Sequence, residues 1–313
     1  MSSREPQSAD AVFMVRPARF GFNAQTAASN AFQQAPQPDC APADAVAAVA
    51  EFDAAVRALQ QAGIGVIVAA DTALPVKPDA IFPNNWLSFH RDGSIVLYPM
   101  LAPNRRAERR EELLDQVVRE GGFHATRTVD LSGREEEEKY LEGTGSLVLD
   151  RGARIAYAAL SQRTDLDVLG EFGQRLDYEV VAFDAADEGG LPVYHTNVLM
   201  AVGERFAVVC GEAITQPRHR AAVCSKLAST GHEVLEISRQ QMRAFAGNCL
   251  ELEAAGHKRI ALSSTAWKTL RGPQREVLER HGEILPLDIP TIERIGGGGV
   301  RCMMAEIHLP RRR

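Results

Sequence analysis

Residues Ser146–Phe183 read SLVLDRGARIAYAALSQRTDLDVLGEFGQRLDYEVVAF and contain every element of one folding unit. Two apolar runs, Ser146–Leu149 and Arg154–Leu160, flank the polar turn Asp150–Arg151–Gly152, which is typical of a β-hairpin. A helix-like stretch follows over residues 165–174, and a strand-like segment over residues 178–183. The stretch therefore predicts a unit of two strands, a helix and a third strand.

The same unit recurs along the chain, although its amino-acid sequence differs each time. The other predicted hairpins are Trp86–Pro99, Asn197–Cys210 and Cys249–Ser263, and a fifth pairing joins Met303–His308 to Val12–Val15. The helices expected after them are Arg105–Arg119, Arg218–Thr230, Ala266–His281 and Ala43–Ala62. The closing strands expected are Phe123–Leu131, His232–Ile237, Glu283–Ile289 and Ile64–Ala69.

The opening strands are spaced by roughly 50–60 residues, a period typical of a closed array of supersecondary units. We therefore predict an α/β fold, a fivefold pseudosymmetric α/β propeller of ββαβ units closed by its own termini. The expected organisation is a flexible N-terminus over residues 1–10, a single propeller domain over 11–309 and a basic tail over 310–313. The alternative is an α+β domain with coincidental hairpins.

Composition excludes several classes of protein. The net charge of −6 argues against nucleic-acid binding. The polar start and the lack of a long apolar run argue against a signal peptide or a membrane segment. Five scattered cysteines without a Cys-x-x-Cys pair favour reduced, cytoplasmic thiols and give no zinc signature. We expect no metal and no cofactor, a small-molecule partner, and leave a homo-oligomer open.

The starts of the five opening strands would converge near the axis of such a ring. They carry Asn84–Asn85, Glu142, His195, Asn248 and Cys302. A thiol, an imidazole and a carboxylate can together perform nucleophilic catalysis even when they are distant in sequence. Each also has a simpler interpretation: a buried thiol, a core histidine or a turn acid.

Cys302 is the favoured nucleophile because Gly296–Gly299 precede it, at the start of an apolar, strand-like run. Glycine tracts occur where the backbone bends tightly or approaches something closely. Cys249, at the fourth strand start, is the rival thiol and lacks such a lead-in. Arg301, next to Cys302, would lower the thiol pKa or touch a substrate, or else simply face solvent.

The order of these short sequences resembles the guanidino-group-modifying superfamily, also called penteins. The matching motifs are Glu142–Gly145, His195–Asn197, Gly297–Met303 and Ser161–Asp165. The resemblance implies a role for each residue. Cys302 would be the nucleophile, His195 the general acid/base and Glu142 the carboxylate that holds the scissile group. Arg163 would bind the carboxylate of an amino-acid substrate.

At two positions the chain departs from the arginine-handling relatives. Those relatives place carboxylates where this chain has Asn85 and Asn197. A buried guanidinium requires carboxylate partners, whereas a neutral ureido group needs both a donor and an acceptor, which asparagine supplies. Asn84 is grouped with these two as a substrate-binding candidate. Asp79 lies nearby and could supply the missing carboxylate.

These departures favour a ureido substrate. Phe20–Asn23 and Pro103–Arg106 also resemble the citrulline-utilisation hydrolases, or citrulline ureidases, within the superfamily. The expected function is a cysteine-dependent hydrolase that converts citrulline to ornithine, ammonia and carbon dioxide. An arginine deiminase, a dimethylarginine hydrolase or an amidinotransferase is the alternative, and a non-catalytic binding protein of the same fold is a second. Phe20–Pro38 is a candidate flap.

Overall fold

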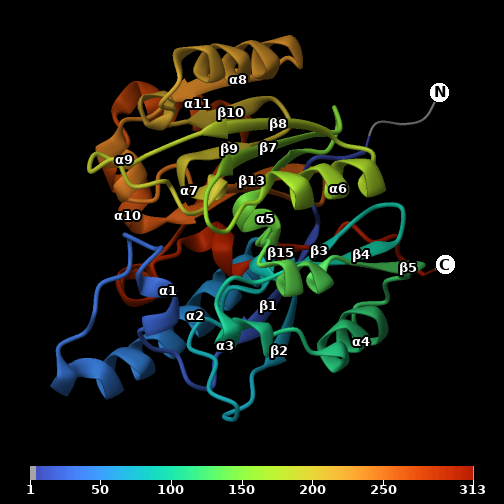
Figure 1. The fold of residues 1–313 in the computed structure, drawn as a ribbon, viewed down its shortest axis with the longest axis vertical. Coiled ribbons are helices and arrows are strands. Elements are labelled where there is room, and N and C mark those ends of the chain that lie inside the picture. The colour runs from blue at the N-terminus through green and yellow to red at the C-terminus, as the bar shows by residue number, and fades with distance from the viewer. Residues whose placement is uncertain (1–4, 313) are drawn as a thin grey trace.

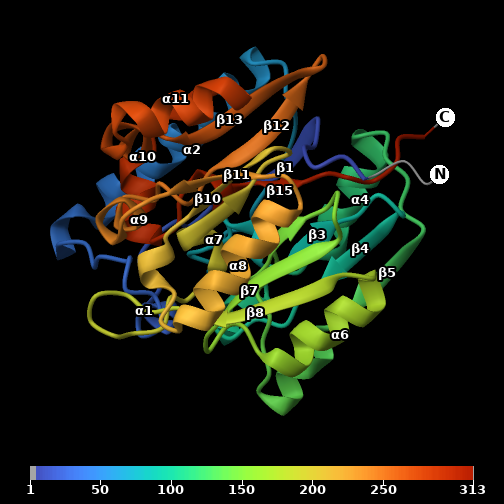
Figure 2. The ribbon, with the colours of Figure 1, turned by 90° about the horizontal axis from the view of Figure 1, so that it is seen from above.

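The computed structural model describes residues 5–312. Its strands form five sheets of three strands, and all five share one topology. In each sheet the first and second strands are antiparallel, and the second and third are parallel. The fivefold pseudosymmetric α/β propeller predicted from the sequence is therefore confirmed (Figures 1 and 2).

The first strands of the sheets pack on one another around a common axis. They are β15 (Ala305–Glu306), β3 (Leu87–Phe89), β6 (Val148–Asp150), β9 (Met200–Val202) and β12 (Leu250–Ala254). The middle strands are β1 (Ala11–Arg16), β4 (Ser94–Leu97), β7 (Ile155–Leu160), β10 (Phe206–Val209) and β13 (His257–Ser263). The outer strands are β2 (Gly65–Ala70), β5 (Arg127–Asp130), β8 (Glu179–Asp184), β11 (Glu233–Glu236) and β14 (Glu283–Leu287).

The longer helices lie on the periphery, between the middle and outer strands of each unit in sequence (Figure 2). They are α2 (Ala41–Gln61), α4 (Glu111–Glu120), α6 (Leu166–Leu176), α8 (Pro217–Ser229) and α11 (Gly272–His281). The shorter helices are α1 (Ala24–Ala27), α3 (Pro103–Arg106), α5 (Gly143–Ser146), α7 (Thr196–Leu199), α9 (Arg239–Arg243) and α10 (Ser264–Thr269). None of the helices within residues 5–312 has both the length and the apolar character needed to cross a bilayer.

The core lies between neighbouring sheets, because the inner and middle strands are buried on both faces. Their apolar side chains pack with the buried faces of the peripheral helices. The pairing of β15 with β1 joins the two ends of the chain, with Val12 opposite Glu306 and Phe13 opposite Ala305. This register confirms the closure of the ring by its termini.

Two predicted helices are broken in the structure. The stretch expected over residues 105–119 divides into α3 and α4, because Arg105 of α3 and Glu108 just after it turn inward and form a buried ion pair. The stretch expected over 266–281 divides into α10 and α11. Gly272 precedes Pro273, and the residue before a proline disfavours the helical conformation, so a new helix begins there with proline in its first turn.

The two chain ends pack more closely than the sequence suggested. Of the flexible start expected over residues 1–10, residues 1–4 lie outside the described part of the chain. Gln7, however, donates to the carbonyls of Leu149 and Val202 at 2.8 and 3.0 Å. Ala9 forms a bridge with Leu252. In the basic tail expected over 310–313, Arg311 is exposed but pairs with Asp10 at 2.9 Å.

Candidate active site

Short helical turns carry the candidate residues to one end of the axis. The 3₁₀ turn Pro83–Asn85 holds Asn84 and Asn85, α5 follows Glu142, and α7 follows His195. Cys302 lies in the 3₁₀ turn Val300–Met303, ahead of β15, and not in the strand as the sequence suggested. These turns pack against one another. The ring therefore brings together residues that lie far apart in sequence.

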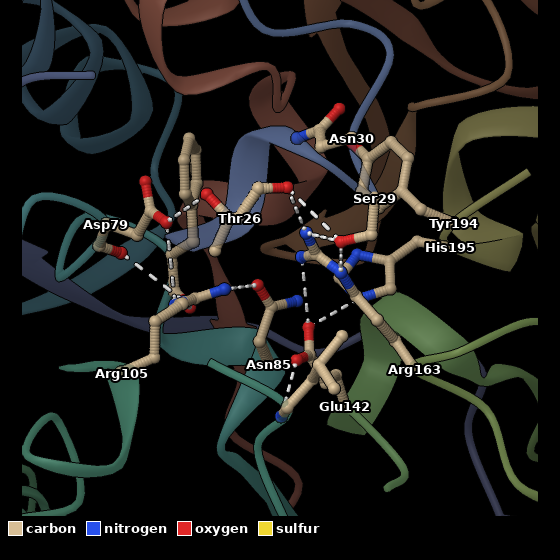
Figure 3. Close-up of polar contacts among 12 residues, drawn as sticks. Thr26, Ser29, Asn30, Asp79, Asn85, Arg105, Glu142, Arg163, Tyr194 and His195 are labelled. Carbon is tan, nitrogen blue, oxygen red and sulfur yellow. Dashed lines mark hydrogen bonds and ion pairs between the residues drawn. The ribbon is translucent and has the colours of Figure 1, made fainter. Parts of the chain in front are cut away.

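A buried hydrogen bond joins Glu142 to His195. The Oε2 atom of Glu142 lies 2.8 Å from Nε2 of His195, and the residues are 0% and 2% exposed (Figure 3). Burial lowers the pKa of His195 to about 4, although the Glu142 hydrogen bond opposes the shift. Burial tends to raise the pKa of Glu142, but Arg163 and His195 together hold it below its usual range.

These shifts define the protonation of the pair. An ionised Glu142 accepts hydrogen bonds only, so Nε2 of the neutral His195 carries the hydrogen and donates it. The other ring nitrogen, Nδ1, is then an unprotonated acceptor. This is the state required of a base near neutral pH.

The Cys302 thiol is 3% exposed and lies beside two carboxamides. The Nδ2 atoms of Asn197 and Asn248 lie 3.5 and 3.3 Å from its Sγ atom. Burial raises the pKa of the thiol, while the Asn248 hydrogen bond opposes the rise. The thiol therefore requires donors at the sulfur to ionise.

Arg163 links Glu142 to the segment that covers the site, residues 20–34, which we call the covering segment. Its Nη1 atom lies 3.3 Å from Oε2 of Glu142. Its other donors reach the carbonyl of Thr26 at 3.0 Å and the hydroxyl of Ser29 at 2.8 Å (Figure 3). Asn30 of the same segment donates to the carbonyl of Gly297 at 3.2 Å. The candidate flap thus closes the site.

Arg105 is a second buried cation, which the sequence did not single out. Its Nη1 atom donates to Oδ1 of Asn85 at 2.8 Å (Figure 3). Its Nε and Nη2 atoms donate to Glu108, each at 2.9 Å. Asp79 lies 3.8 Å from Nε of Arg105 and accepts from Asn23 at 2.8 Å. The resemblance of Pro103–Arg106 to the citrulline-utilisation hydrolases drew attention to this segment, but sequence spacing alone could not show that the Arg105 side chain points inward.

One small cavity is lined by Cys302, His195, Asn85 and Arg163 together with Asp79, Arg105 and Gly296–Gly298. The remaining predicted residues lie around it. Glu142 is behind His195, Asn84 accepts from Asn85 at 3.1 Å, and Asn197 lies beside the thiol. The structure therefore brings together all but one of the predicted site residues.

The exception is Arg301, together with the rival thiol. The guanidinium of Arg301 turns away from this cavity and pairs with Glu306. It lines a separate cavity that also contains Cys249. Burial raises the pKa of Cys249 to about 12. The side chain of Arg301 is thus absent from the lining of the Cys302 cavity, because the ion pair holds it elsewhere. Its charge nevertheless opposes the rise that burial causes in the pKa of the Cys302 thiol.

Gly145 allows the turns to approach one another. A Cβ atom at this position would lie 2.5 Å from Nδ2 of Asn85 and 2.8 Å from Nδ1 of His195. We expect Gly145→Ala to lower the free energy of unfolding by about 1–3 kcal/mol, as overpacking does in tight cores. Urea denaturation measures this change. Gly170→Ala on α6, where the Cβ would contact nothing within 4 Å, is the control and should be neutral or stabilising. Equal stability of both variants would contradict the close packing.

Across residues 5–312, no three His, Cys, Asp or Glu side chains gather in an arrangement suited to a metal ion. The five cysteines are free thiols.

Comparison with solved structures reveals the same fold in enzymes that act on arginine derivatives. The N-terminal domain of ArgZ, an arginine dihydrolase from the ornithine-ammonia cycle in Cyanobacteria, matches with a TM-score of 0.73 and 16% identity, over 96% of this chain and 98% of that one. A dimethylarginine dimethylaminohydrolase adduct with S-methyl-L-thiocitrulline matches with a TM-score of 0.65 and 16% identity, over 95% and 99% of the two chains.

Unliganded AgrE matches with a TM-score of 0.74 and 17% identity, over 97% of this chain. The match covers 40% of AgrE, so this chain spans about two-fifths of that protein. No curated protein matches the sequence at a significant level.

A family model described as N,N dimethylarginine dimethylhydrolase, eukaryotic, matches residues 16–309, nearly the whole chain. The match confirms the resemblance to the superfamily that the short sequence motifs indicated. The chain thus belongs to the N,N-dimethylarginine dimethylhydrolase family, within the pentein or amidinotransferase superfamily of hydrolases that act on non-peptide C–N bonds.

Proposed function

We propose that this protein hydrolyses the ureido group of citrulline, or of a close analogue, to give ornithine, ammonia and carbon dioxide. The observation that carries the proposal is the orientation of Asn85. Because the guanidinium of Arg105 can only donate, the Asn85 atom that it contacts at 2.8 Å must be the carbonyl oxygen. The NH₂ group donates one hydrogen to Oδ1 of Asn84 at 3.1 Å, so one N–H of this carboxamide is left for the cavity.

Further donors lie at the thiol. The NH₂ groups of Asn197 and Asn248 both point at Cys302. Asn248 gives its two hydrogens to the Asn197 carbonyl and to the sulfur, which leaves the NH₂ group of Asn197 to meet a substrate. A guanidinium has five N–H donors and no acceptor, so its donors would face this donor, whereas the carbonyl oxygen of a ureido group can accept from it. The same oxygen becomes negative in the tetrahedral intermediate, where fixed donors stabilise it.

Both oxygens of Glu142 already have hydrogen-bond partners. Its Oε2 atom accepts from His195 and Arg163, and its Oε1 atom accepts from the backbone of Leu101 at 3.1 Å. A guanidinium at the thiol would therefore compete with these partners for its counter-charge. A neutral ureido group has no such requirement.

The proposed reaction begins when the Cys302 thiol gives its proton to Nδ1 of His195 and the sulfur bonds to the ureido carbon. The C–N bond to the ornithine nitrogen then breaks, and that nitrogen takes the proton from His195. Water adds to the remaining carbamoyl thioester, losing a proton to His195, and the C–S bond breaks. The released carbamate decomposes to ammonia and carbon dioxide, so one water is consumed per citrulline.

Entry of the substrate requires the covering segment to move. The free space between the cavity side chains is about 10 Å³, close to that of one water molecule. Arg163 is engaged by Ser29 and Thr26 of this segment. We propose that the carboxylate of the substrate replaces these two partners, which would give Arg163 the role of carboxylate clamp implied by the superfamily.

A guanidine hydrolase is the second candidate. The family description and the neighbouring structures name arginine derivatives. In addition, Oδ1 of Asp79 is buried and without a hydrogen-bond partner among the described residues, so it could accept from a cationic group.

A substrate panel separates the two candidates. The purified protein is incubated separately with citrulline, arginine and dimethylarginine, and ornithine, ammonia and citrulline are quantified. Ornithine and ammonia from citrulline alone support the ureidase. Citrulline formed from arginine or from dimethylarginine would overturn it in favour of the guanidine hydrolase.

Asn85→Asp tests the donor that carries the proposal. The substitution keeps the shape and retains an acceptor for Arg105, but it replaces the NH₂ donor with a carboxylate oxygen. We expect kcat/KM for citrulline to fall at least about 100-fold, since a lost polar complement in a binding site has effects of this size or larger. Steady-state kinetics on citrulline and arginine measure it. Undiminished citrulline turnover by a folded Asn85→Asp protein would contradict the assignment.

A further inference from the structure

Asn248 lies where three of the ring's turns meet. It ends the turn that follows α9, and its side chain is 1% exposed. Its Oδ1 atom accepts from the backbone N–H of Arg301 at 2.9 Å. Its Nδ2 atom donates to the carbonyl of Asn197 at 2.8 Å and to Sγ of Cys302 at 3.3 Å.

These partners allow only one orientation of the carboxamide. A backbone N–H can only donate, and a backbone carbonyl can only accept, so Oδ1 and Nδ2 cannot exchange places. The second hydrogen of Nδ2 is thus directed at the sulfur. Asn197 differs, because its carboxamide has contacts with Cys302 through both Nδ2, at 3.5 Å, and Oδ1, at 3.8 Å. Asn197 can face either a thiol or a thiolate, whereas Asn248 can only donate.

The surroundings of Cys302 place no cationic side chain in direct contact with the sulfur among the described contacts. The imidazole of His195 is engaged by Glu142, and the guanidinium of Arg301 is engaged by Glu306 and by the carbonyl of Met304. A thiolate in so buried a position is stabilised chiefly by hydrogen-bond donors, since bulk water is excluded.

Two glycines make the position of Asn248 possible. A Cβ atom on Gly299 would lie 2.6 Å from Oδ1 of Asn248 and would push the carboxamide away from Arg301. A Cβ atom on Gly247 would lie 2.5 Å from the carbonyl of Val198 and would lift the turn from its neighbour. The last glycine of the run before Cys302 is therefore required by Asn248.

From this geometry we infer that Asn248 is a further catalytic residue, a fixed hydrogen-bond donor that stabilises the Cys302 thiolate. It also holds the nucleophile turn in place through Arg301. The inference rests on the proposed function only in that Cys302 is the nucleophile. It applies equally to a ureido and to a guanidino substrate.

The test measures ionisation of the thiol without any substrate. Alkylation of Cys302 by iodoacetamide is followed from acid to alkaline pH by peptide mass spectrometry in wild type, Asn248→Asp and Asn248→Ser. Asn248→Asp keeps the acceptor for Arg301 but removes the donor to sulfur, and we expect a rise of at least about one unit in the thiol pKa, which is a tenfold slower alkylation at neutral pH. With the substrate identified by the panel, we expect kcat to fall about 100-fold or more.

Gln116→Glu, which changes a carboxamide on α4 that donates to Val68, is the matched control and should leave the thiol titration unchanged. Asn248→Ser separates loss of the donor from the negative charge that Asn248→Asp adds, since its shorter side chain withdraws the donor from the sulfur without adding a charge, and the thiol pKa is expected to rise in both variants. An unchanged thiol pKa in a folded variant would overturn the inference, even if kcat fell, because a purely structural role does not move the titration. Failure of citrulline turnover would not affect this readout.

Discussion

Cys302→Ala is expected to abolish turnover, with a fall in kcat of about 10⁴-fold or more. Removing the nucleophile of a covalent mechanism leaves only the contribution of binding and of the fixed donors. The variant should remain folded, because Cys302 belongs to a buried apolar cluster and the substitution deletes a single sulfur atom. Ornithine and ammonia release from citrulline measures the effect, and thermal denaturation checks the fold.

Cys249→Ala is the matched control for this substitution. Cys249 is as buried as Cys302, at 2% against 3% exposure, but it lines a separate cavity together with Arg301. We expect its turnover to stay within a few-fold of wild type. The reverse pattern, in which Cys249→Ala is inactive and Cys302→Ala retains activity, would show that the rival thiol is the nucleophile.

Glu142→Gln is expected to reduce kcat by about 10³- to 10⁴-fold. The ionised carboxylate holds His195 with its hydrogen on Nε2 and leaves Nδ1 free as the base. A glutamine can present its NH₂ group to Nε2 instead, which would move the hydrogen to Nδ1, and an equivalent tautomer change in a serine-protease triad has an effect of this order. The pH profile of kcat/KM should show the loss at every pH at which the wild type is active.

The same substitution should also destabilise the protein. Glu142 is fully buried, and Arg163 would lose the anionic partner that lies 3.3 Å from it. Removing one member of a buried ion pair lowers the free energy of unfolding by about 3–5 kcal/mol. Glu283→Gln, an exposed acid on β14 paired with Arg259, is the control and should change neither quantity. Wild-type kcat in Glu142→Gln would refute the proposed role of Glu142.

The repeat was predictable because hairpins and alternating segments are local signals. Turns such as Asp150–Gly152 and apolar runs such as Arg154–Leu160 carry their own conformational preference. The helix predictions failed where a local pattern was overridden by buried contacts. The sequence predicted one helix over residues 105–119, whereas the buried pair Arg105–Glu108 interrupts it. A buried charge depends on partners that sequence spacing does not show.

Some residues of the candidate site were likewise predicted from the sequence, and others were found only in the structure. Cys302, His195 and Glu142 were predicted from their places at the starts of the repeats, and the structure brings them to one end of the axis. Arg105 was missed because sequence spacing does not show that its side chain points inward to Asn85. Asn248 was placed at a strand start but given no role, because its partners Arg301 and Cys302 belong to another unit. Arg301 was grouped with the site because it adjoins Cys302, but its ion pair with Glu306 holds its side chain outside the cavity that contains Cys302.

The sequence by itself determined the number of units, their strand order and the residues that begin each one, because these depend on contacts between near neighbours along the chain. Only the tertiary structure decided which way each polar side chain faces. The orientations of Asn85 and Asn248 come from the Arg105 guanidinium, a backbone N–H and a backbone carbonyl, all contributed by segments outside their own turns. The direction of the hydrogen bond at the Cys302 thiol therefore depends on how the units assemble, since Asn248 and Cys302 belong to different units.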